Sequence, residues 1–264
     1  MFKDELSQVI NASKTKTAFL NNNLFGYFLA SCLAGIYVGF GILLIFTIGG
    51  ILDGSPFTKV IMGVSFGIAL SLVIVAGAEL FTGNNFIMTL GFLSKSVTIS
   101  DTAKVWLICF IGNWIGSIVL ALLFYYSNLG VDDISRFIST AAVTKMGLSP
   151  IELILRGMLC NTLVCLAVWC SFRLKSDSAK LIMVFWCLFA FITTGFEHSI
   201  ANMTLLTVSL LCSADNGVTI AGYFYNIGFV TLGNMLGAIL LLAIPYHIIA
   251  TKNKGKPKKE RSLG

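Results

Sequence analysis

The segment GFEHSIANM, Gly195–Met203, interrupts an apolar stretch over 181–211 in which Glu197 is the only charged side chain. A second segment, GAELFTGNN over Gly77–Asn85, interrupts the apolar stretch 60–93 in the same way. Both stretches are longer than the roughly 20 residues that one membrane-spanning helix needs. Non-helical backbone at membrane depth is tolerated only where it is buried or lines a cavity. The two segments therefore predict two broken membrane helices.

The rest of the chain has the composition of an integral membrane protein. Of its 264 residues, 56% are apolar and 11% are charged, whereas soluble domains carry about 25% charged residues. We predict an all-α membrane protein with six spans, which form one domain over 24–250. The predicted spans are 24–51, 60–93, 104–126, 151–172, 181–211 and 219–249.

The two interruptions share a motif, which suggests that the chain is an internal repeat. Both read G-x-E-x4-N, and Gly77 and Gly195 lie 118 residues apart (195 − 77). A second motif, G-N-x-x-G, begins at Gly112 and at Gly233, 121 residues apart (233 − 112). With three spans in each half, the second half enters the membrane inverted, as in channels and transporters whose substrate passes where broken helices meet. We expect the polar residues of both breaks to converge near the bilayer centre, namely Glu79, Thr82, Asn84, Glu197, His198 and Asn202.

The basic residues predict the orientation. With both termini in the cytoplasm, 14 of the 18 Lys and Arg residues lie on the cytoplasmic side, which is the asymmetry typical of membrane proteins. The other four, expected outside, are Lys59, Arg136, Lys145 and Arg156.

The two ends of the chain are polar. The segment 1–23 is interpreted either as an amphipathic helix along the membrane, with Leu6, Val9 and Ile10 on one face, or as a solvated tail. The segment 251–264 is expected to be a basic cytoplasmic tail. Basic residues beside apolar spans mark a membrane side, so nucleic-acid binding is not expected.

Metal, redox and catalytic chemistry have little support. The seven cysteines lie in or beside apolar stretches without a CxxC pair, which is typical of packing residues. His198 and His247 are expected at different depths, too far apart to share a haem, and the chain has no HExxH motif. We expect no cofactor, no metal and no enzyme activity.

Four motifs resemble those of the formate/nitrite transporter family, namely GAELFTGN, CNTLVCLAVW, GFEHSIANM and TLGN. The resemblance covers about 24–249, and AGIYVGFGILLIFTIGG and EHSIANMTL look closest to the nitrite-channel branch. It implies an aquaporin-like fold that assembles as a homopentamer with one pore in each protomer. It also implies a location in the cell (inner) membrane.

The resemblance also implies roles for individual residues. His198 projects into the pore midway, where Thr82 hydrogen-bonds to it, and an imidazole can donate a hydrogen bond to an anion or exchange a proton near neutral pH. Lys145, in the outer loop, matches a vestibule lysine that attracts anions. Asn161 and Asn234 match asparagines around the pore, which either steady the backbone or bind the anion. Asn202, from the second break, is the third polar residue expected at the pore.

Two further sets complete the expected site. Glu79 and Glu197 are interpreted as structural, together with Gly77 and Gly195, because unpaired carboxylates would repel an anion. We expect them to accept hydrogen bonds from backbone N–H groups freed at the breaks. Apolar constrictions implied on both sides of the histidine would penalise a bare anion far more than a neutral acid. They are Phe66, Leu70, Leu80, Phe81, Val164 and Phe191.

The leading hypothesis is therefore a channel, or a proton-linked transporter, for small monovalent anions of weak acids. Nitrite comes first, and formate and hydrosulfide are the alternatives within the family. The sequence leaves passive and proton-coupled transport open. A membrane protein without transport activity is the remaining alternative, and the matched buried charges of the two halves argue against it.

Overall fold

The computed structural model describes residues 2–212 and 217–251, so the predicted basic tail beyond Thr251 lies outside the described residues. Within these ranges the chain is helical and has no strand, in agreement with the predicted class. The elements are α1 (Lys3–Asn22), α2 (Leu24–Ile51), α3 (Thr58–Ser65), α4 (Ile68–Val75), α5 (Phe81–Leu93), α6 (Ile99–Tyr126), α7 (Asp132–Met146), α8 (Pro150–Arg173), α9 (Asp177–Thr194), α10 (Ser199–Cys212), α11 (Ile220–Leu236), the π-helix η1 (Gly237–Ala243) and α12 (Ile244–Thr251).

Six segments of the described chain are long and apolar enough to cross a membrane, which confirms the predicted number of spans. Among them, α2 has the predicted bounds, whereas α6 begins five residues before the predicted position 104. The earlier start has a local cause. Thr98 accepts a hydrogen bond from the Asp101 backbone N–H, and the Asp101 carboxylate accepts one from the Thr98 N–H. This reciprocal capping box lets a helix begin among polar residues.

Both predicted breaks are present. The chain leaves α4 at Gly77 and α9 at Gly195, where φ is +76° and +77°, a conformation that glycine adopts without steric cost. The second half of each broken helix is then α5 or α10. A third interruption, between α3 and α4 at Phe66–Gly67, was not predicted, because both residues keep right-handed helical angles and no charged residue or polar cluster marks the position.

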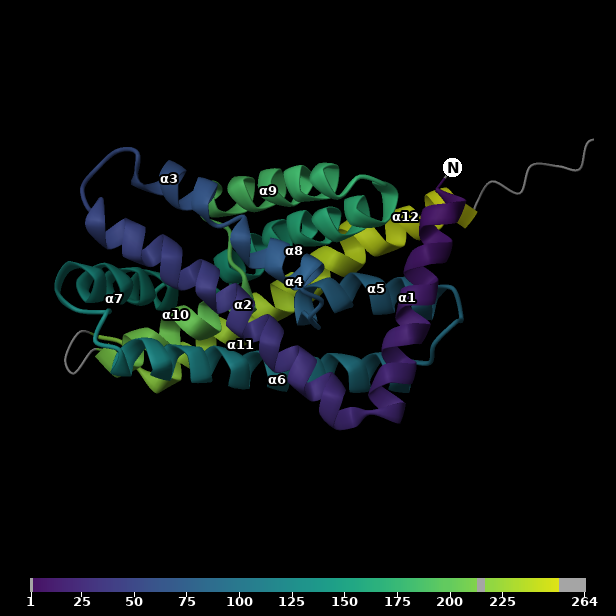
Figure 1. Ribbon diagram of the computed structural model, residues 1–264, viewed down its shortest axis with the longest axis horizontal. Helices are drawn as coiled ribbons and strands as arrows, with labels where there is room; N and C mark the ends of the chain where they lie inside the picture. The colour runs from purple at the N-terminus through teal and green to yellow at the C-terminus, as the bar shows by residue number, and fades with distance from the viewer. Residues whose placement is uncertain (1, 213–216, 252–264) are drawn as a thin grey trace, which may run out of the picture.

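The two halves match element by element. Each has a helix outside the spans (α1 or α7), a span (α2 or α8), a broken helix (α3 to α5, or α9 and α10) and a final span (α6, or α11 to α12). In Figure 1, α7 lies at one end of the molecule, and α1 and α12 lie together at the other. We refer to these as the α7 end and the α1 end.

Helix α7 corrects the sequence-based description of 127–150 as an outer loop. Its ends carry the charges that favour a helix, with Asp132 and Asp133 in the first turn and Lys145 in the last, where they complement the helix dipole. The segment is too polar for a span, so a search for spans passes over it. Lys145 is thereby held on a helix.

Small residues bring the spans of each half together. A Cβ atom on Gly116 of α6 would lie 2.0 Å from the Cys32 carbonyl oxygen on α2. In the second half, a Cβ atom on Gly237 would lie 2.2 Å from the Met158 carbonyl oxygen on α8. The two glycines are 121 residues apart (237 − 116), which is the offset of the G-N-x-x-G motifs. The same close contact therefore joins the first and last spans of both halves.

Candidate functional site

Three cavities follow one another through the middle of the described chain. The α1-side cavity, of about 680 Å³, includes Lys16 and Glu79 in its lining. The central cavity is about 10 Å³ and the α7-side cavity about 210 Å³. Leu70 and Leu80 line both of the first two, and Phe191 and His198 line both of the last two. The cavities thus form one path, closed at its centre by a space no larger than one water molecule needs.

Five of the six predicted constriction residues line the central cavity, namely Phe66, Leu70, Leu80, Val164 and Phe191. Phe66 and Phe191 meet edge to face, with ring centroids 5.4 Å apart. Phe81 is the exception, because its ring packs on Phe110 at 5.1 Å. It begins α5, and neighbouring helix residues project about 100° apart. The structure adds three lining residues that the sequence analysis missed, Val38, Ala69 and Leu188.

His198 lies where the central and α7-side cavities meet, with 4% of its surface exposed. Its Nε2 atom is 3.0 Å from the Thr82 hydroxyl, so the expected contact between the two breaks is present. Its ring lies against Phe191, with centroids 6.1 Å apart and planes 20° apart. Thr82 is fully buried behind it, so the imidazole is the group that faces the path.

The hydrogen bonds of His198 indicate its tautomer. The Ala201 backbone N–H donates to Nδ1 over 3.1 Å, as it would to the side chain of a helix N-cap residue. Nδ1 is therefore an acceptor, and in the neutral ring the proton is on Nε2. In this arrangement Nε2–H donates to Thr82, and a second proton on Nδ1 would face the Ala201 N–H. The ring is set as a hydrogen-bond donor, and protonation would require it to move.

The carboxylates of Glu79 and Glu197 have a different environment from the one predicted. Lys145 Nζ lies 2.7 Å from a Glu197 carboxylate oxygen, and Asn202 Nδ2 donates to the other over 2.6 Å. Lys16 Nζ lies 2.7 Å from Glu79. The expectation that these carboxylates accept from freed backbone N–H groups was wrong. Each binds instead the ammonium group of a lysine on the helix that precedes the first span of its half.

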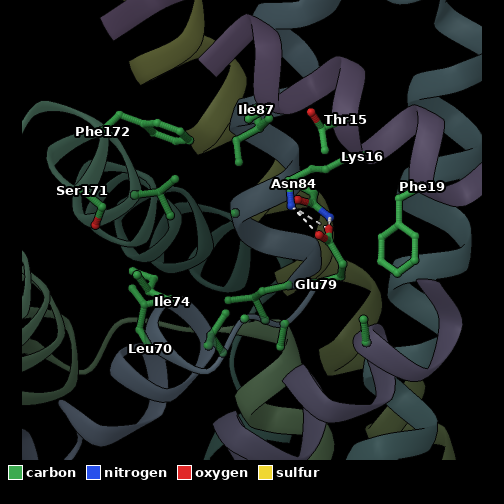
Figure 2. Close-up of a pocket in the computed structure, with 18 of the residues that line it drawn as sticks. Thr15, Lys16, Phe19, Leu70, Ile74, Glu79, Asn84, Ile87, Ser171 and Phe172 are labelled. Atoms are coloured by element: carbon green, nitrogen blue, oxygen red, sulfur yellow. Dashed lines mark hydrogen bonds and ion pairs between the residues drawn. The ribbon is translucent and has the colours of Figure 1, made fainter. Parts of the chain in front are cut away.

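The pairs also correct the expected convergence at the centre. Figure 2 shows Lys16 and Asn84 pointing at Glu79 in the wall of the α1-side cavity. Asn84 donates to the carboxylate over 2.9 Å, and the Tyr27 hydroxyl donates over 3.1 Å. Glu197 belongs to the opposite half of the path. Of the six residues expected to converge, only Thr82 and His198 meet at the centre. Each carboxylate lies beside its lysine instead, toward its own end of the molecule.

The freed backbone groups at both breaks are bound by asparagines. Asn113 Oδ1 accepts from the Phe81 N–H over 2.9 Å, and its Nδ2 donates to the Glu79 carbonyl over 2.8 Å. Asn234 repeats this at Ser199 and Glu197, over 2.9 Å in each case. Asn113 was not singled out from the sequence, although the G-N-x-x-G repeat that contains Asn234 also contains it.

The other predicted polar residues lie at different depths in the wall. Asn161 is fully buried, and its amide donates to the carbonyls of Thr82 (3.2 Å) and Asn234 (2.8 Å), so it joins the start of α5 to α11. Of the two roles expected for Asn161 and Asn234, the structure therefore shows them bound to backbone. Asn202 does line the α7-side cavity. The hydrogen-bond network around the two carboxylates also contains three residues that were not predicted, Lys16, Tyr27 and Asn226.

A fourth cavity, of about 400 Å³, lies beside the α7-side cavity, with which it shares Lys59, Lys145 and Gly195. We call it the mouth cavity. All four basic residues assigned to the outer side by the sequence line it, namely Lys59, Arg136, Lys145 and Arg156. Residues from loops and helices far apart in the chain are thus collected on one surface.

Known proteins are similar to this chain in both sequence and fold. The family model for the formate/nitrite transporter matches residues 3–248. The "Nitrite transporter NirC" of Salmonella typhimurium is 41% identical over 261 residues, which cover 96% of this chain and 94% of that protein. A solved structure titled "FNT family ion channel" is 38% identical, has a TM-score of 0.89 and covers 93% of this chain and 98% of its own. A second, titled "Pentameric formate channel with formate bound", is 25% identical, has a TM-score of 0.73 and covers 85% and 96%. The chain therefore belongs to the formate/nitrite transporter family.

Proposed function

We propose that this protein is a membrane channel for small monovalent anions of weak acids, with nitrite as its main substrate. One observation carries the proposal: a path lined by Lys16 at one end and Lys145 at the other is closed at its centre by apolar side chains and one histidine. Monoanions are attracted to both ends and meet a hydrogen-bond donor at the point where losing water costs most.

The constriction sets the selectivity. An ion that enters a space lined by Phe66, Leu70, Leu80, Val164 and Phe191 loses its water without gaining polar contacts. In the Born description this cost rises with the square of the charge, so a dianion pays about four times what a monoanion of equal size pays. A neutral acid pays far less. Small weak acids, which can cross this layer as neutral molecules or as singly charged anions, are therefore favoured.

His198 and the half-helices offset part of that cost. Its Nε2–H group can turn from Thr82 to a passing anion, and the Thr82 hydroxyl then has to find another partner. The N-termini of α5 and α10 both begin beside the centre, directly after the breaks. A helix N-terminus carries about half a positive charge, so both half-helices favour an anion there and disfavour a cation.

The two half-buried lysines, Lys16 and Lys145, are each paired with a carboxylate, and the pairing changes how they act on an anion. Each is joined to a carboxylate, so the ion pair as a whole is neutral and the ammonium group is fixed at the wall. A fixed ammonium still offers its remaining N–H donors to an anion in the cavity. Lys145 can thereby attract and orient an anion at the α7 end, and Lys16 at the α1 end, without holding it tightly.

The choice of nitrite rests on the relative named as a nitrite transporter. Formate is the second candidate, because a solved relative is titled as a formate channel, and hydrosulfide is the third. From the same title we infer a homopentamer. Because all three cavities lie within one chain, we infer a separate pore in each protomer. We place the channel in the cell (inner) membrane and assign it no cofactor and no enzyme activity.

The sidedness and domain limits are also proposals. We place the α1 end in the cytoplasm, since most of the basic residues lie on that side. The channel domain is then 24–250, preceded by a cytoplasmic segment 1–23 and followed by a basic tail, 251–264.

The test is anion flux in liposomes that contain the purified protein. Nitrite, formate, hydrosulfide and sulfate are compared under equal gradients, with protein-free liposomes as the control. The proposal expects flux of the three monoanions, with nitrite fastest, and no flux of sulfate. Sulfate flux comparable to nitrite flux would contradict the apolar barrier. Absence of flux for all four anions would contradict the channel function itself.

A further inference from the structure

The mouth cavity is lined by more basic residues than acidic ones. Its basic residues come from three helices: Lys59 from α3, Arg136 and Lys145 from α7, and Arg156 from α8. Two carboxylates, Asp53 and Glu197, lie in the same lining. Four cations against two carboxylates leave a net charge of +2 on the wall (4 − 2). The basic residues that the sequence scatters over the outer side thus face one space of about 400 Å³.

Most of these cations are only loosely neutralised. The pair Arg136–Asp133 is short, at 2.9 Å, but both side chains are about two thirds exposed. The pairs Arg136–Asp53 and Arg156–Glu152 are long, at 3.9 and 3.8 Å. Exposed pairs of this kind contribute about 0 to 1 kcal/mol.

The two lysines differ from these loosely paired arginines, one because it is unpaired among the described residues and the other because its partner is buried. Lys59 makes no ion pair with the residues that the structure describes. Lys145 is the only one of the four that is committed to a buried carboxylate, with 3% of the Glu197 side chain exposed. An anion of sufficient charge can therefore recruit Lys59, Arg136 and Arg156 at little cost and leave the Lys145–Glu197 pair intact.

We propose that the mouth cavity is a second anion site, which binds doubly charged oxyanions and thereby blocks the path. The arginine side chains can bind two oxygens of one anion at once. A dianion gains twice the attraction of a monoanion at this wall. It cannot pass the constriction, where its desolvation cost is about fourfold higher.

Binding at this site does not depend on the proposed channel function, whereas the block does. The test therefore has two arms, with sulfate as the probe in both. In the first, the thermal unfolding midpoint of the purified protein is measured in detergent with increasing sulfate. In the second, nitrite flux at low nitrite concentration is measured with sulfate on both sides of the vesicle membrane. Gluconate salts keep the ionic strength equal, because screening alone weakens surface attraction.

The double variant Arg136→Gln/Arg156→Gln removes two of the loosely paired cations, and Lys180→Gln removes a cation from the α1-side cavity as the control. In the unaltered protein, sulfate at ten times its Kd should raise the midpoint and lower competing nitrite flux about elevenfold, from the factor 1 + [L]/Kd. In the double variant, sulfate should lower nitrite flux by less than about twofold, and it should raise the midpoint by correspondingly less. The control variant should respond like the unaltered protein.

Two results would overturn the site: no effect of sulfate on the unaltered protein in either arm, or an equal effect on the double variant. A midpoint shift that depends on the arginines, in a protein without nitrite flux, would support the site and overturn the proposed channel function.

Discussion

Replacing Lys145 with glutamine should destabilise the protein more than the matching change at Lys16. Lys145→Gln removes the ammonium group from the Glu197 carboxylate, whose side chain is 3% exposed. The one other donor shown to that carboxylate is the Asn202 amide, at 2.6 Å, among the described residues. Lys16→Gln leaves Glu79 with two donors, Tyr27 at 3.1 Å and Asn84 at 2.9 Å, and with 13% of its side chain exposed.

The size of the effect follows from the burial. Removing one partner of a buried ion pair costs about 3 to 5 kcal/mol, because the other charge remains uncompensated. For a chain of this size, each kcal/mol lowers the unfolding midpoint by roughly 2 to 4 °C. Lys145→Gln should therefore lower the midpoint by about 6 to 20 °C. Lys16→Gln should lower it by less, since Glu79 keeps more donors and more contact with solvent.

The double variant Lys145→Gln/Glu197→Gln separates this explanation from a simple loss of packing. It removes both charges and keeps amides of similar shape, so most of the lost stability should return. Thermal unfolding in detergent of the unaltered protein, Lys145→Gln, Glu197→Gln and the double variant gives the coupling between the two residues. A midpoint unchanged by Lys145→Gln would refute the reasoning. So would a double variant whose loss of stability equals the sum of the losses in Lys145→Gln and Glu197→Gln, because the pair would then have no favourable interaction to lose.

Three further changes test other parts of the path. His198→Phe removes the Nε2–H donor at similar volume, so nitrite flux should fall roughly tenfold and lose its response to a pH gradient; an unchanged pH response in liposomes would take His198 out of the mechanism. Gly195→Ala should cost about 1 to 2 kcal/mol from backbone strain alone, because φ is +77° and a Cβ atom there would have no described atom within 4 Å; an unchanged unfolding midpoint would contradict this. Phe191→Ala removes the ring that closes the constriction against Phe66, so nitrite flux should rise and discrimination against sulfate should weaken; stopped-flow flux with both anions would show an unchanged ratio if the ring does not form the barrier.

The sequence was enough to predict the architecture, because the spans and breaks depend on local patterns. An apolar stretch of sufficient length predicts a span, and a glycine beside a polar cluster predicts a break at Gly77 or Gly195. The two motif offsets, 118 and 121, then predict the inverted repeat without any knowledge of packing. The helix break at Phe66–Gly67 has no such pattern and was found only in the structure.

The site was less predictable, because the partners of its charged residues come from segments that are distant in the sequence and meet only in the folded structure. Lys16 lies 63 residues before Glu79, and Lys145 lies 52 residues before Glu197. Sequence reasoning assigned a role to Lys145 but not to Lys16, and it could not show that either lysine reaches a carboxylate, since both lie on helices outside the spans. The repeat offsets would not have supplied the second pairing, because Lys16 and Lys145 lie 129 residues apart (145 − 16) rather than 118 or 121.

The small size of the central cavity has an electrical consequence. Once electrolyte fills the cavities on either side, almost all of the membrane voltage falls across the single layer formed by Leu70, Leu80, Phe191 and His198. A monovalent anion then gains or loses about 2.3 kcal/mol per 100 mV within that layer. This is comparable to one or two hydrogen bonds. The voltage therefore acts on the anion at the step where it loses water, so this side-chain layer sets both the chemical selectivity and the voltage dependence of the current.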